Sequence, residues 1–284
     1  MPKTSDGTNA PSGLVMPVAV GLALVALLGI ALFMHFTGSP TTMDKVREQS
    51  TLTIGYAVEP PYAFVDSGGR VTGYDPELAK LVAHELGVKN IRWRLVDFES
   101  LIPELLSGRI DVIAAGMFDT TERRTLVRFS NPSFIPRAGL LVRKSDPVQA
   151  NTTNDLASVR GIRVAVIAGS VEEAELIANG INKTRLVVAP DPGTAVTSLM
   201  AGVTDAVALS VQTLRWAVGV RGDYASHQLD VLDLGQAMGA RGEPLSGAFA
   251  FRVDDEELLN AWNKAMAQVM ARPGFKEVQD EFGF

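Results

Sequence analysis

Two stretches of this chain offer, between them, an arginine, a carboxylate and two aromatic rings. The stretch Gly116-Met117-Phe118-Asp119-Thr120-Thr121-Glu122-Arg123 and the upstream stretch Glu59-Pro60-Pro61-Tyr62 both have the composition of turns at strand ends. An arginine fork binds a carboxylate through two parallel hydrogen bonds, and an aromatic ring attracts a cation through its negative face. A small zwitterion satisfies both groups, so these residue types predict binding rather than catalysis.

The composition argues against several other classes of function. The chain has 284 residues, 46% of them hydrophobic, with a formal net charge of −6 and no cysteine. The mild acidity and the lack of a basic run argue against nucleic acid as a partner. The absence of cysteine excludes disulfides, thiol catalysis and a lipobox anchor. His35, His84 and His227 lie far apart, without the spacing of metal ligands, so neither a metal nor a cofactor is predicted.

An apolar stretch near the N-terminus predicts a membrane segment. Residues 14–36 contain no acidic or strongly basic side chain. About 20 apolar residues span a bilayer as a helix, whereas the apolar core of a signal peptide has about 7–15. Because residues 35–40 make a poor cleavage site, we expect an uncleaved signal-anchor in preference to a signal peptide or a buried core helix. Residues 1–13 are then a tail, and the folded part is expected in the periplasm or on the outer face of the cytoplasmic membrane.

Strands and helices alternate along the rest of the chain. Strands are predicted at residues 52–56, 91–95, 111–115, 140–143, 163–167, 186–188, 205–209 and 247–252. Helices are predicted at residues 76–86, 100–106, 171–178, 194–200, 254–270 and 274–282. The first of these helices is expected to have Asp75 as its N-cap and Pro76 at its first position. This alternation is typical of βα units and favours an α/β fold with mainly parallel sheets.

The βα pattern occurs twice, which predicts two lobes. After a linker at residues 37–47, residues 48–139 and 244–284 are expected to form the first lobe, and residues 140–243 the second. The strands near residues 140 and 249 suggest a double crossing between the lobes, with a ligand cleft between them.

Further motifs give the chain a resemblance to a known family. They are Gly55-Tyr56 to Phe64, Gly73-Tyr74-Asp75-Pro76-Glu77-Leu78-Ala79, Leu101-Ile102-Pro103, Leu106-Ser107-Gly108-Arg109-Ile110-Asp111, Gly116-Met117, Thr120-Thr121-Glu122-Arg123, Phe129-Ser130-Asn131-Pro132 and Gly169-Ser170. From about residue 48 onward the chain resembles the extracellular solute-binding proteins, family 3, of ABC importers for amino acids and related polar solutes. The resemblance implies a two-lobed periplasmic-binding-protein fold (type II) with a double-strand hinge, here preceded by one N-terminal transmembrane helix. It also implies a monomer that delivers a small zwitterionic solute to ABC permease subunits.

The resemblance assigns roles to three residues. In this family the arginine that matches Arg123 binds the carboxylate of the ligand; the alternative is a solvated surface arginine. Gly116 is expected to offer backbone groups to the ligand, because a residue without Cβ lets the chain approach closely. Ser170, at the start of a helix in the second lobe, is expected to add a hydroxyl and a backbone N–H, or to serve only as an N-cap.

Two departures from the amino-acid pattern bear on the ligand. Phe118 stands where amino-acid binders usually carry Ser or Thr, and Ser210 stands where they usually carry an acid for the α-ammonium group. Because a desolvated ammonium without a partner is costly, an ordinary amino acid is less favoured. Glu59, Tyr62, Phe98 and Phe118 instead resemble the cage of members that bind ectoine and hydroxyectoine. The alternative for Phe98 and Phe118 is a role in the hydrophobic core.

Three functions are therefore weighed. The main hypothesis is an ABC substrate-binding protein for ectoine or hydroxyectoine, with a polar amino-acid receptor as its alternative. An enzyme similar to the cyclohexadienyl dehydratases would use Glu59 as acid or base. Because no second titratable group is visibly placed to complete proton transfer, we expect no enzyme activity. A tethered sensor or scaffold would need a signalling partner.

Overall fold

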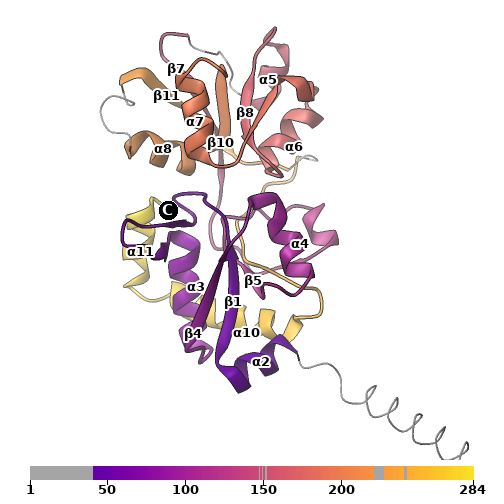
Figure 1. Ribbon diagram of the computed structural model, residues 1–284, viewed down its shortest axis with the longest axis vertical. Helices are drawn as coiled ribbons and strands as arrows, with labels where there is room; N and C mark the ends of the chain where they lie inside the picture. The colour runs from indigo at the N-terminus through magenta and orange to yellow at the C-terminus, as the bar shows by residue number, and fades with distance from the viewer. Residues whose placement is uncertain (1–40, 147, 149, 151, 221–226, 240–241) are drawn as a thin grey trace, which may run out of the picture. The chain divides into compact units, whose positions relative to one another are not determined.

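The computed structural model of this protein describes residues 41–284, except 147, 149, 151, 221–226 and 240–241 (Figure 1). The predicted tail and membrane segment, residues 1–36, lie outside the described residues. None of the helices in the described ranges is both long and apolar enough to cross a bilayer. Thr42–Phe284 form a unit of their own, which contains both lobes.

The first lobe is built on a five-stranded sheet with the strand order β4-β1-β5-β12-β6 (Figure 1). Its strands are β1 (Thr51–Tyr56), β4 (Asn90–Leu95), β5 (Val112–Ile113), β6 (Arg128–Phe129) and β12 (Ala250–Phe251). A short hairpin, β2 (Phe64–Val65) and β3 (Val71–Thr72), lies outside this sheet. The helices of this lobe are α2 (Thr42–Gln49), α3 (Tyr74–Glu85), α4 (Leu101–Leu106), α10 (Glu256–Met270) and α11 (Phe275–Phe282). β1 runs parallel to β4 and β5, whereas β12 is antiparallel to both of its neighbours.

The second lobe is built on a five-stranded sheet with the order β11-β7-β10-β8-β9. Its strands are β7 (Arg137–Arg143), β8 (Val164–Ile167), β9 (Leu186–Ala189), β10 (Ala206–Ser210) and β11 (Leu229–Gln236). Its helices are α5 (Thr153–Ser158), α6 (Val171–Ala178), α7 (Pro192–Met200) and α8 (Val211–Gly219). β8, β9 and β10 are parallel, and β7 is antiparallel to β10 and β11. Both sheets are therefore mixed, whereas the sequence predicts mainly parallel ones.

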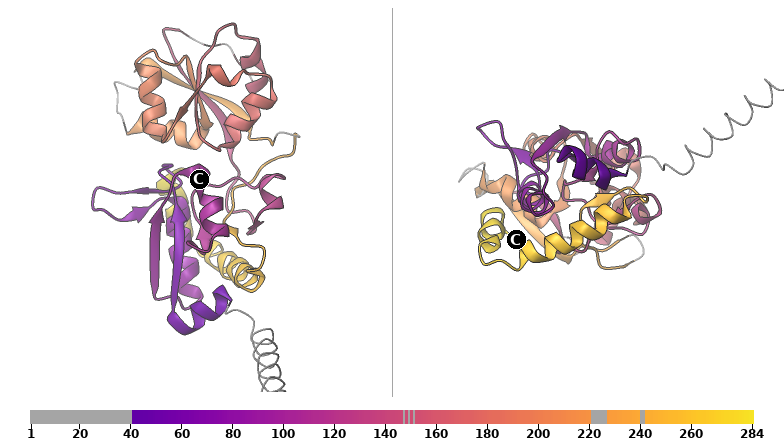
Figure 2. Two further views of the ribbon diagram at one scale, coloured as in Figure 1. Left: turned by 45° about the vertical axis from the view of Figure 1, so that its right-hand side comes forward. Right: turned by 90° about the horizontal axis from the view of Figure 1, so that it is seen from below.

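Helices cover both faces of the second sheet, because successive side chains of a strand point to opposite faces. Leu141 and Val207 pack in one hydrophobic cluster with residues of α7 and α8. Leu140 and Ala208, one position away in each strand, pack in another cluster with residues of α5 and α6. The left view of Figure 2 shows these helices on the two sides of the sheet. The second lobe thus has the layered α/β architecture that the sequence predicts.

The two chain segments that join the lobes lie side by side. Arg137 at the start of β7 pairs with Gln236 at the end of β11, and Ala237 donates its N–H to the carbonyl of Pro136 at 3.0 Å. The chain leaves the first sheet just before β7 and returns just after β11. The sequence suggests the return at the strand near residue 249, but β12 already lies inside the first sheet.

The start of α3 differs from its prediction. The helix begins at Tyr74 with Gly73 at its N-cap, so Asp75 is not the cap. The Asp75 carboxylate is 1% exposed and instead accepts the N–H of Gly116 at 2.7 Å. Pro76 lies within the first turn, where backbone N–H groups have no acceptor inside the helix, so it does no harm there.

The helix α2 covers residues that the sequence assigns in part to the linker. Val46 on this helix is 2% exposed. Lys45 forms an ion pair of 2.7 Å with the buried Asp111, and Arg252 donates to the Thr42 hydroxyl at 2.7 Å. A buried valine, an ion pair and a hydrogen bond from an arginine therefore hold α2 on the first lobe.

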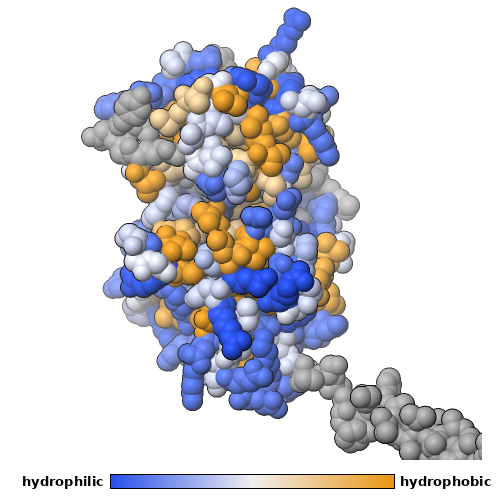
Figure 3. All heavy atoms as spheres, viewed as in Figure 1, coloured by the Kyte–Doolittle hydropathy of each residue, from blue (hydrophilic) through white to orange (hydrophobic). Residues whose placement is uncertain are grey.

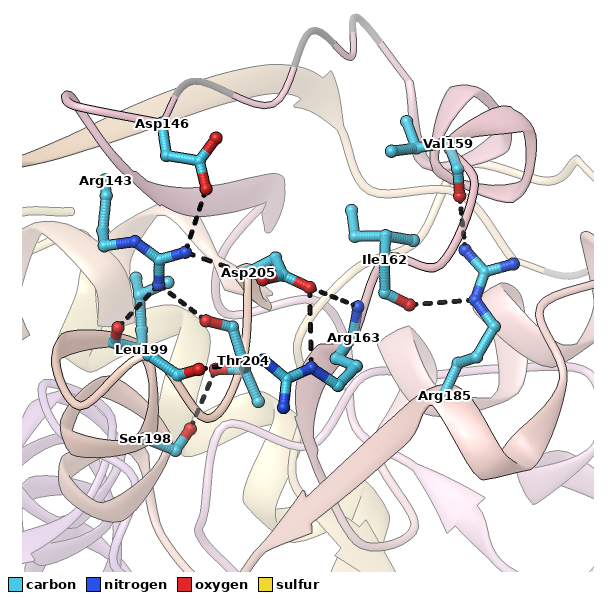
Figure 4. A network of polar contacts seen from close by, with 11 residues as sticks. Arg143, Asp146, Val159, Ile162, Arg163, Arg185, Ser198, Leu199, Thr204 and Asp205 are labelled. Atoms are coloured by element: carbon cyan, nitrogen blue, oxygen red, sulfur yellow. Dashed lines mark hydrogen bonds and ion pairs between the residues drawn. The ribbon is translucent and has the colours of Figure 1, made fainter.

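Several arginines form hydrogen bonds and ion pairs around the amino ends of the parallel strands in the second sheet (Figure 4). Arg143 donates to the carbonyls of Leu199 and Thr204 at 2.8 and 2.7 Å, and Asp205 accepts the backbone N–H of Arg163 at 2.8 Å. Arg163 and Asp205 directly precede β8 and β10. The carboxyl ends of these strands, where α/β sheets bind ligands, lie at the opposite edge.

Hydrophobic residues are exposed at several places on the face that Figure 3 shows. Val58 just after β1, Val65 in β2 and Leu95 at the end of β4 are 40%, 44% and 58% exposed. Single exposed side chains of this kind are ordinary on a protein surface, so they do not by themselves mark an interface.

Candidate functional site

One cavity brings together all the residues that the sequence predicts to bind the ligand. It encloses about 360 Å³ of space between protein atoms, part of it open to solvent. The predicted residues that line it are Glu59, Tyr62, Phe98, Gly116, Phe118, Arg123, Ser170 and Ser210. Sequence reasoning missed the other lining residues, Ile167, Val171, Glu172 and Leu209.

The segments that line the cavity follow or end parallel strands. In the first lobe these segments follow β1, β4 and β5, and in the second lobe they come at the ends of β8 and β10. The carboxyl ends of parallel strands meet at one edge of a sheet. This topology brings residues distant in sequence, from Glu59 to Ser210, to one cavity between the lobes.

Glu59 is a buried acid held by the turn after β1. Its backbone N–H donates to the carbonyl of Ala63 at 2.8 Å, and its side chain accepts the Thr213 hydroxyl at 3.2 Å. Burial raises the pKa of Glu59 to about 8; the nearby Glu172 carboxyl adds to the rise, and the Thr213 hydrogen bond opposes it. Glu59 is therefore largely protonated near neutral pH, and a cation placed beside it would favour the carboxylate.

Glu172 is a second buried acid in the same cavity. It lies in the first turn of α6 and is 8% exposed. Burial raises its pKa to about 7, Glu175 adds to this, and Arg123 lowers it. The structure therefore places a second titratable group in the cavity with Glu59, which the sequence did not visibly place there. Acids are common in the first turn of any helix because of the helix dipole, so residue type alone does not single out Glu172.

Arg123 is a partly buried residue that faces the cavity, not a solvated surface arginine. It donates to the carbonyl of Phe118 at 2.7 Å and to the carbonyl of Gly169, in the second lobe, at 3.0 Å. Burial lowers its pKa to about 10, so it keeps its charge near neutral pH. Since a guanidinium has five N–H groups, further donors remain for a carboxylate. The neighbouring Arg124 pairs with Asp119 instead, at 2.6 Å.

The aromatic rings serve both the cavity wall and the core. Phe118 is 6% exposed, and its ring meets that of Tyr62 edge to face, with centroids 6.5 Å apart. Behind the wall, Tyr62 packs on Phe134 at 4.8 Å. Phe98 lies 5.6 Å from the Arg123 guanidinium, so this ring already has a cation of the protein beside it.

Gly116 lines the cavity, and its backbone N–H is already used within the protein. This N–H donates to Asp75, so the predicted offer of backbone groups to the ligand stays a prediction for the carbonyl of Gly116. Its φ is +64°, and a Cβ would lie 2.4 Å from Cγ of Tyr62. Glycine is therefore required here by the packing of Tyr62 and by the backbone conformation.

Replacing Gly116 with alanine should destabilise the fold by about 2 kcal/mol or more, because strain at positive φ adds to the displacement of Tyr62. Gly87 is a matched control, since its φ is +77° and no atom lies within 4 Å of the position that a Cβ would take. Gly87→Ala should cost only the backbone strain, about 1 kcal/mol. Chemical denaturation measures both losses, and equal losses would show that the Tyr62 contact does not matter.

Ser170 and Ser210 are both helix N-caps. The Ser170 hydroxyl accepts the N–H of Glu173 at 3.1 Å. The Ser210 hydroxyl accepts the N–H of Thr213 at 3.1 Å and donates to the Thr213 hydroxyl oxygen at 3.1 Å. Ser170 is therefore an N-cap that also lines the cavity, and its contact with the ligand stays a prediction. Ser210 is the last residue of β10, so this strand end carries no acid.

Two α/β lobes that are joined by two adjacent segments and enclose a small charged cavity define a two-lobed binding protein of the periplasmic type. The chain belongs to the bacterial extracellular solute-binding proteins, family 3, whose sequence profile matches residues 52–284.

Three comparisons illustrate this membership. A probable amino-acid ABC transporter periplasmic-binding protein, y4tE of Sinorhizobium fredii, is 27% identical over 276 residues, which are 96% of this chain and 88% of the relative. The crystal structure of EhuB in complex with hydroxyectoine has a TM-score of 0.76 at 27% identity and covers 85% of this chain and 91% of its own. An ancestral arginine-binding protein bound to arginine has a TM-score of 0.71 at 29% identity and covers 82% and 98%.

The protein is therefore the extracellular or periplasmic substrate-binding protein of an ABC importer for a small polar solute. It is a binding protein and not an enzyme. The predicted class of protein is confirmed.

Proposed function

We propose that the protein captures a polar α-amino acid for import. The observation that carries this proposal is the position of Glu172, a buried acid in the same cavity as Arg123. Ser210 leaves the end of β10 without an acid, which on the sequence alone argues against an amino-acid ligand. Glu172, on a different helix, supplies the missing carboxylate.

The electrostatic neighbours of Arg123 support this assignment. Glu172 is the acid with the strongest charge interaction with Arg123, and Arg123 in turn lowers the pKa of Glu172. In an α-amino acid the carboxylate and the ammonium share one carbon, so they need neighbouring partners of opposite charge. Arg123 takes the carboxylate through its free N–H groups, and Glu172 takes the ammonium.

Glu59 and the aromatic wall face the side chain of this ligand. After burial, the charge of Glu172 is the largest cause of the raised pKa of Glu59. Arg123 is not among the groups that shift the pKa of Glu59. A polar or cationic side chain that ends near Glu59 would find a carboxylate, with the rings of Tyr62 and Phe118 alongside. The relatives that transport amino acids or bind arginine agree with such a ligand.

Ectoine or hydroxyectoine is the second candidate. The similarity to the hydroxyectoine complex and the aromatic residues Tyr62, Phe98 and Phe118 favour it. The delocalised cation of such a ligand suits ring faces, with Glu59 accepting an N–H and Arg123 binding the carboxylate.

Calorimetry with L-arginine, L-glutamine, ectoine and hydroxyectoine should separate the candidates. We expect an amino acid to bind most tightly. Glu172→Gln should then weaken its binding by roughly 10- to 100-fold, the scale of a hydrogen bond to a charged group. Phe118→Thr should weaken ectoine by about 0.5–2 kcal/mol, one cation–π contact.

Glu175→Gln provides the matched control for Glu172. Glu175 lies on the same helix and its pKa is also raised by burial, but it does not line the cavity. Because its charge only adds to the raised pKa of Glu172, Glu175→Gln should change the affinity far less than Glu172→Gln does, and without weakening it. Tighter binding of ectoine or hydroxyectoine than of either amino acid, together with an unaffected Glu172→Gln variant, would overturn the amino-acid proposal in favour of the cage.

A further inference from the structure

The first turns of α8 meet the loop after β1 across the boundary between the lobes. Thr213 donates its hydroxyl to Oε1 of Glu59 at 3.2 Å. The rings of Trp216 and Phe64 lie with their centroids 5.4 Å apart. Glu59 and Phe64 belong to the first lobe, whereas Thr213 and Trp216 belong to α8 in the second. The bond between Thr213 and Glu59 therefore requires that the two lobes are together.

The hydroxyl hydrogen of Thr213 has a defined direction. Thr213 is fully buried, with an exposed fraction of 0%. Ser210 donates its own hydroxyl to the Thr213 oxygen at 3.1 Å, so this oxygen acts as an acceptor toward Ser210. The single hydrogen of Thr213 is then directed to Glu59. In the described part of the chain, this hydrogen bond falls on one of the two Glu59 side-chain oxygens, Oε1.

The other groups around Glu59 disfavour its charge. Glu172 from α6 and Asp191 from the N-cap of α7 both raise its pKa, in addition to burial. Burial raises the pKa of the Tyr62 phenol, on the same loop, and the charge of Glu59 adds to that rise. In the described part of the chain, no lysine or arginine forms an ion pair with Glu59, and the Thr213 hydrogen bond is the contact that favours its ionised form.

We propose that Thr213 is a positioning residue that couples closure of the lobes to the charge of Glu59. When the lobes meet, Thr213 orients the carboxylate and stabilises its ionised form, so that the second lobe prepares Glu59 for a cationic part of the ligand. This inference rests on the proposed function, because it assumes that Glu59 faces such a cation.

The first test needs no ligand. Carbon-13 spectra of protein labelled at the glutamate carboxyls, with Glu59 assigned through Glu59→Gln, follow the titration of Glu59. Thr213→Val keeps the shape of the side chain and removes the hydroxyl, so the Glu59 midpoint should move to higher pH. Thr213→Ser keeps the hydroxyl and should restore the wild-type midpoint.

The second test uses L-arginine as the probe in calorimetry. Thr213→Val should weaken its binding by about 5- to 10-fold near neutral pH, the scale of one hydrogen bond to a charged group, and by less at pH values above the pKa of Glu59. Thr213→Ser should recover most of the affinity. A residue with a merely structural role would lower stability without changing the pH dependence.

Failure of the proposed function and failure of the coupling through Thr213 would give different results. If wild-type protein binds neither amino acids nor ectoine, the proposed function is wrong, and the titration of Glu59 still decides the role of Thr213. If wild-type protein binds L-arginine, and Thr213→Val titrates and binds as wild type, the coupling is disproved. Should Thr213→Val fail to fold, Thr213→Ala, which also lacks the hydroxyl but adds no methyl in its place, is tested in the same way.

Discussion

Replacing Arg123 with alanine should weaken the binding of a carboxylate ligand by at least about 100-fold. The reason is that a bidentate fork makes two charge-assisted hydrogen bonds, each worth roughly 1.5–3 kcal/mol. Lysine should rescue poorly, since it offers a point charge in place of a planar fork. Calorimetry with L-arginine measures the loss of affinity.

Arg124→Ala is the matched control for this variant. Arg124 is the next residue in sequence, but its guanidinium pairs with Asp119 and does not line the cavity. It should leave the affinity unchanged. Because Arg123 also bonds two carbonyls, circular dichroism must show that the alanine variant remains folded. A folded variant with wild-type affinity would remove Arg123 from the site.

Affinity for a cationic amino acid should rise about tenfold or more between about pH 6 and pH 8, the change expected when one proton is released on binding. Without ligand, the pKa of Glu59 is about 8 and that of Glu172 about 7, both above the ordinary value of 4.5. A bound cation favours the carboxylates, so binding releases protons and weakens as the pH falls. Calorimetry in buffers of different ionisation enthalpy measures this release.

The stability of the ligand-free protein should change in the opposite direction. Since the folded state of each raised acid binds more protons than the unfolded chain, the free energy of unfolding falls as the pH rises from about 4.5 to about 8. Glu59→Gln should flatten both pH profiles and raise the ligand-free melting temperature at about pH 8, because it removes a buried ionisation. Equal affinity at both pH values, without proton release, would contradict the raised pKa values.

Much of the fold follows from local sequence patterns. The helix α6 matches its predicted range of residues, because its N-cap serine and its apolar periodicity are both local signals. The mixed character of the sheets could not be predicted in this way. β12 joins the first sheet antiparallel to both neighbours, and that pairing depends on contacts between residues far apart in the chain.

The residues of the candidate site also divide into those that the local sequence reveals and those that depend on the rest of the fold. Arg123, Glu59 and Phe118 are marked by residue type near strand ends, and they do line the cavity. Glu172 could not be recognised, because an acid in the first turn of a helix has an ordinary explanation in the helix dipole. The partner of Gly116 was also beyond prediction, since it depends on where Asp75 on another element points.

The strand order of the first sheet has a consequence for biosynthesis. β12 lies between β5 and β6, so the first sheet lacks an interior strand until residues 250–251 have been made. All five strands of the second sheet come from the single continuous segment 137–236. During vectorial emergence of the chain, the second lobe is therefore complete while the first is still unfinished, and the unpaired edges of β5 and β6 must be protected from aggregation in the meantime.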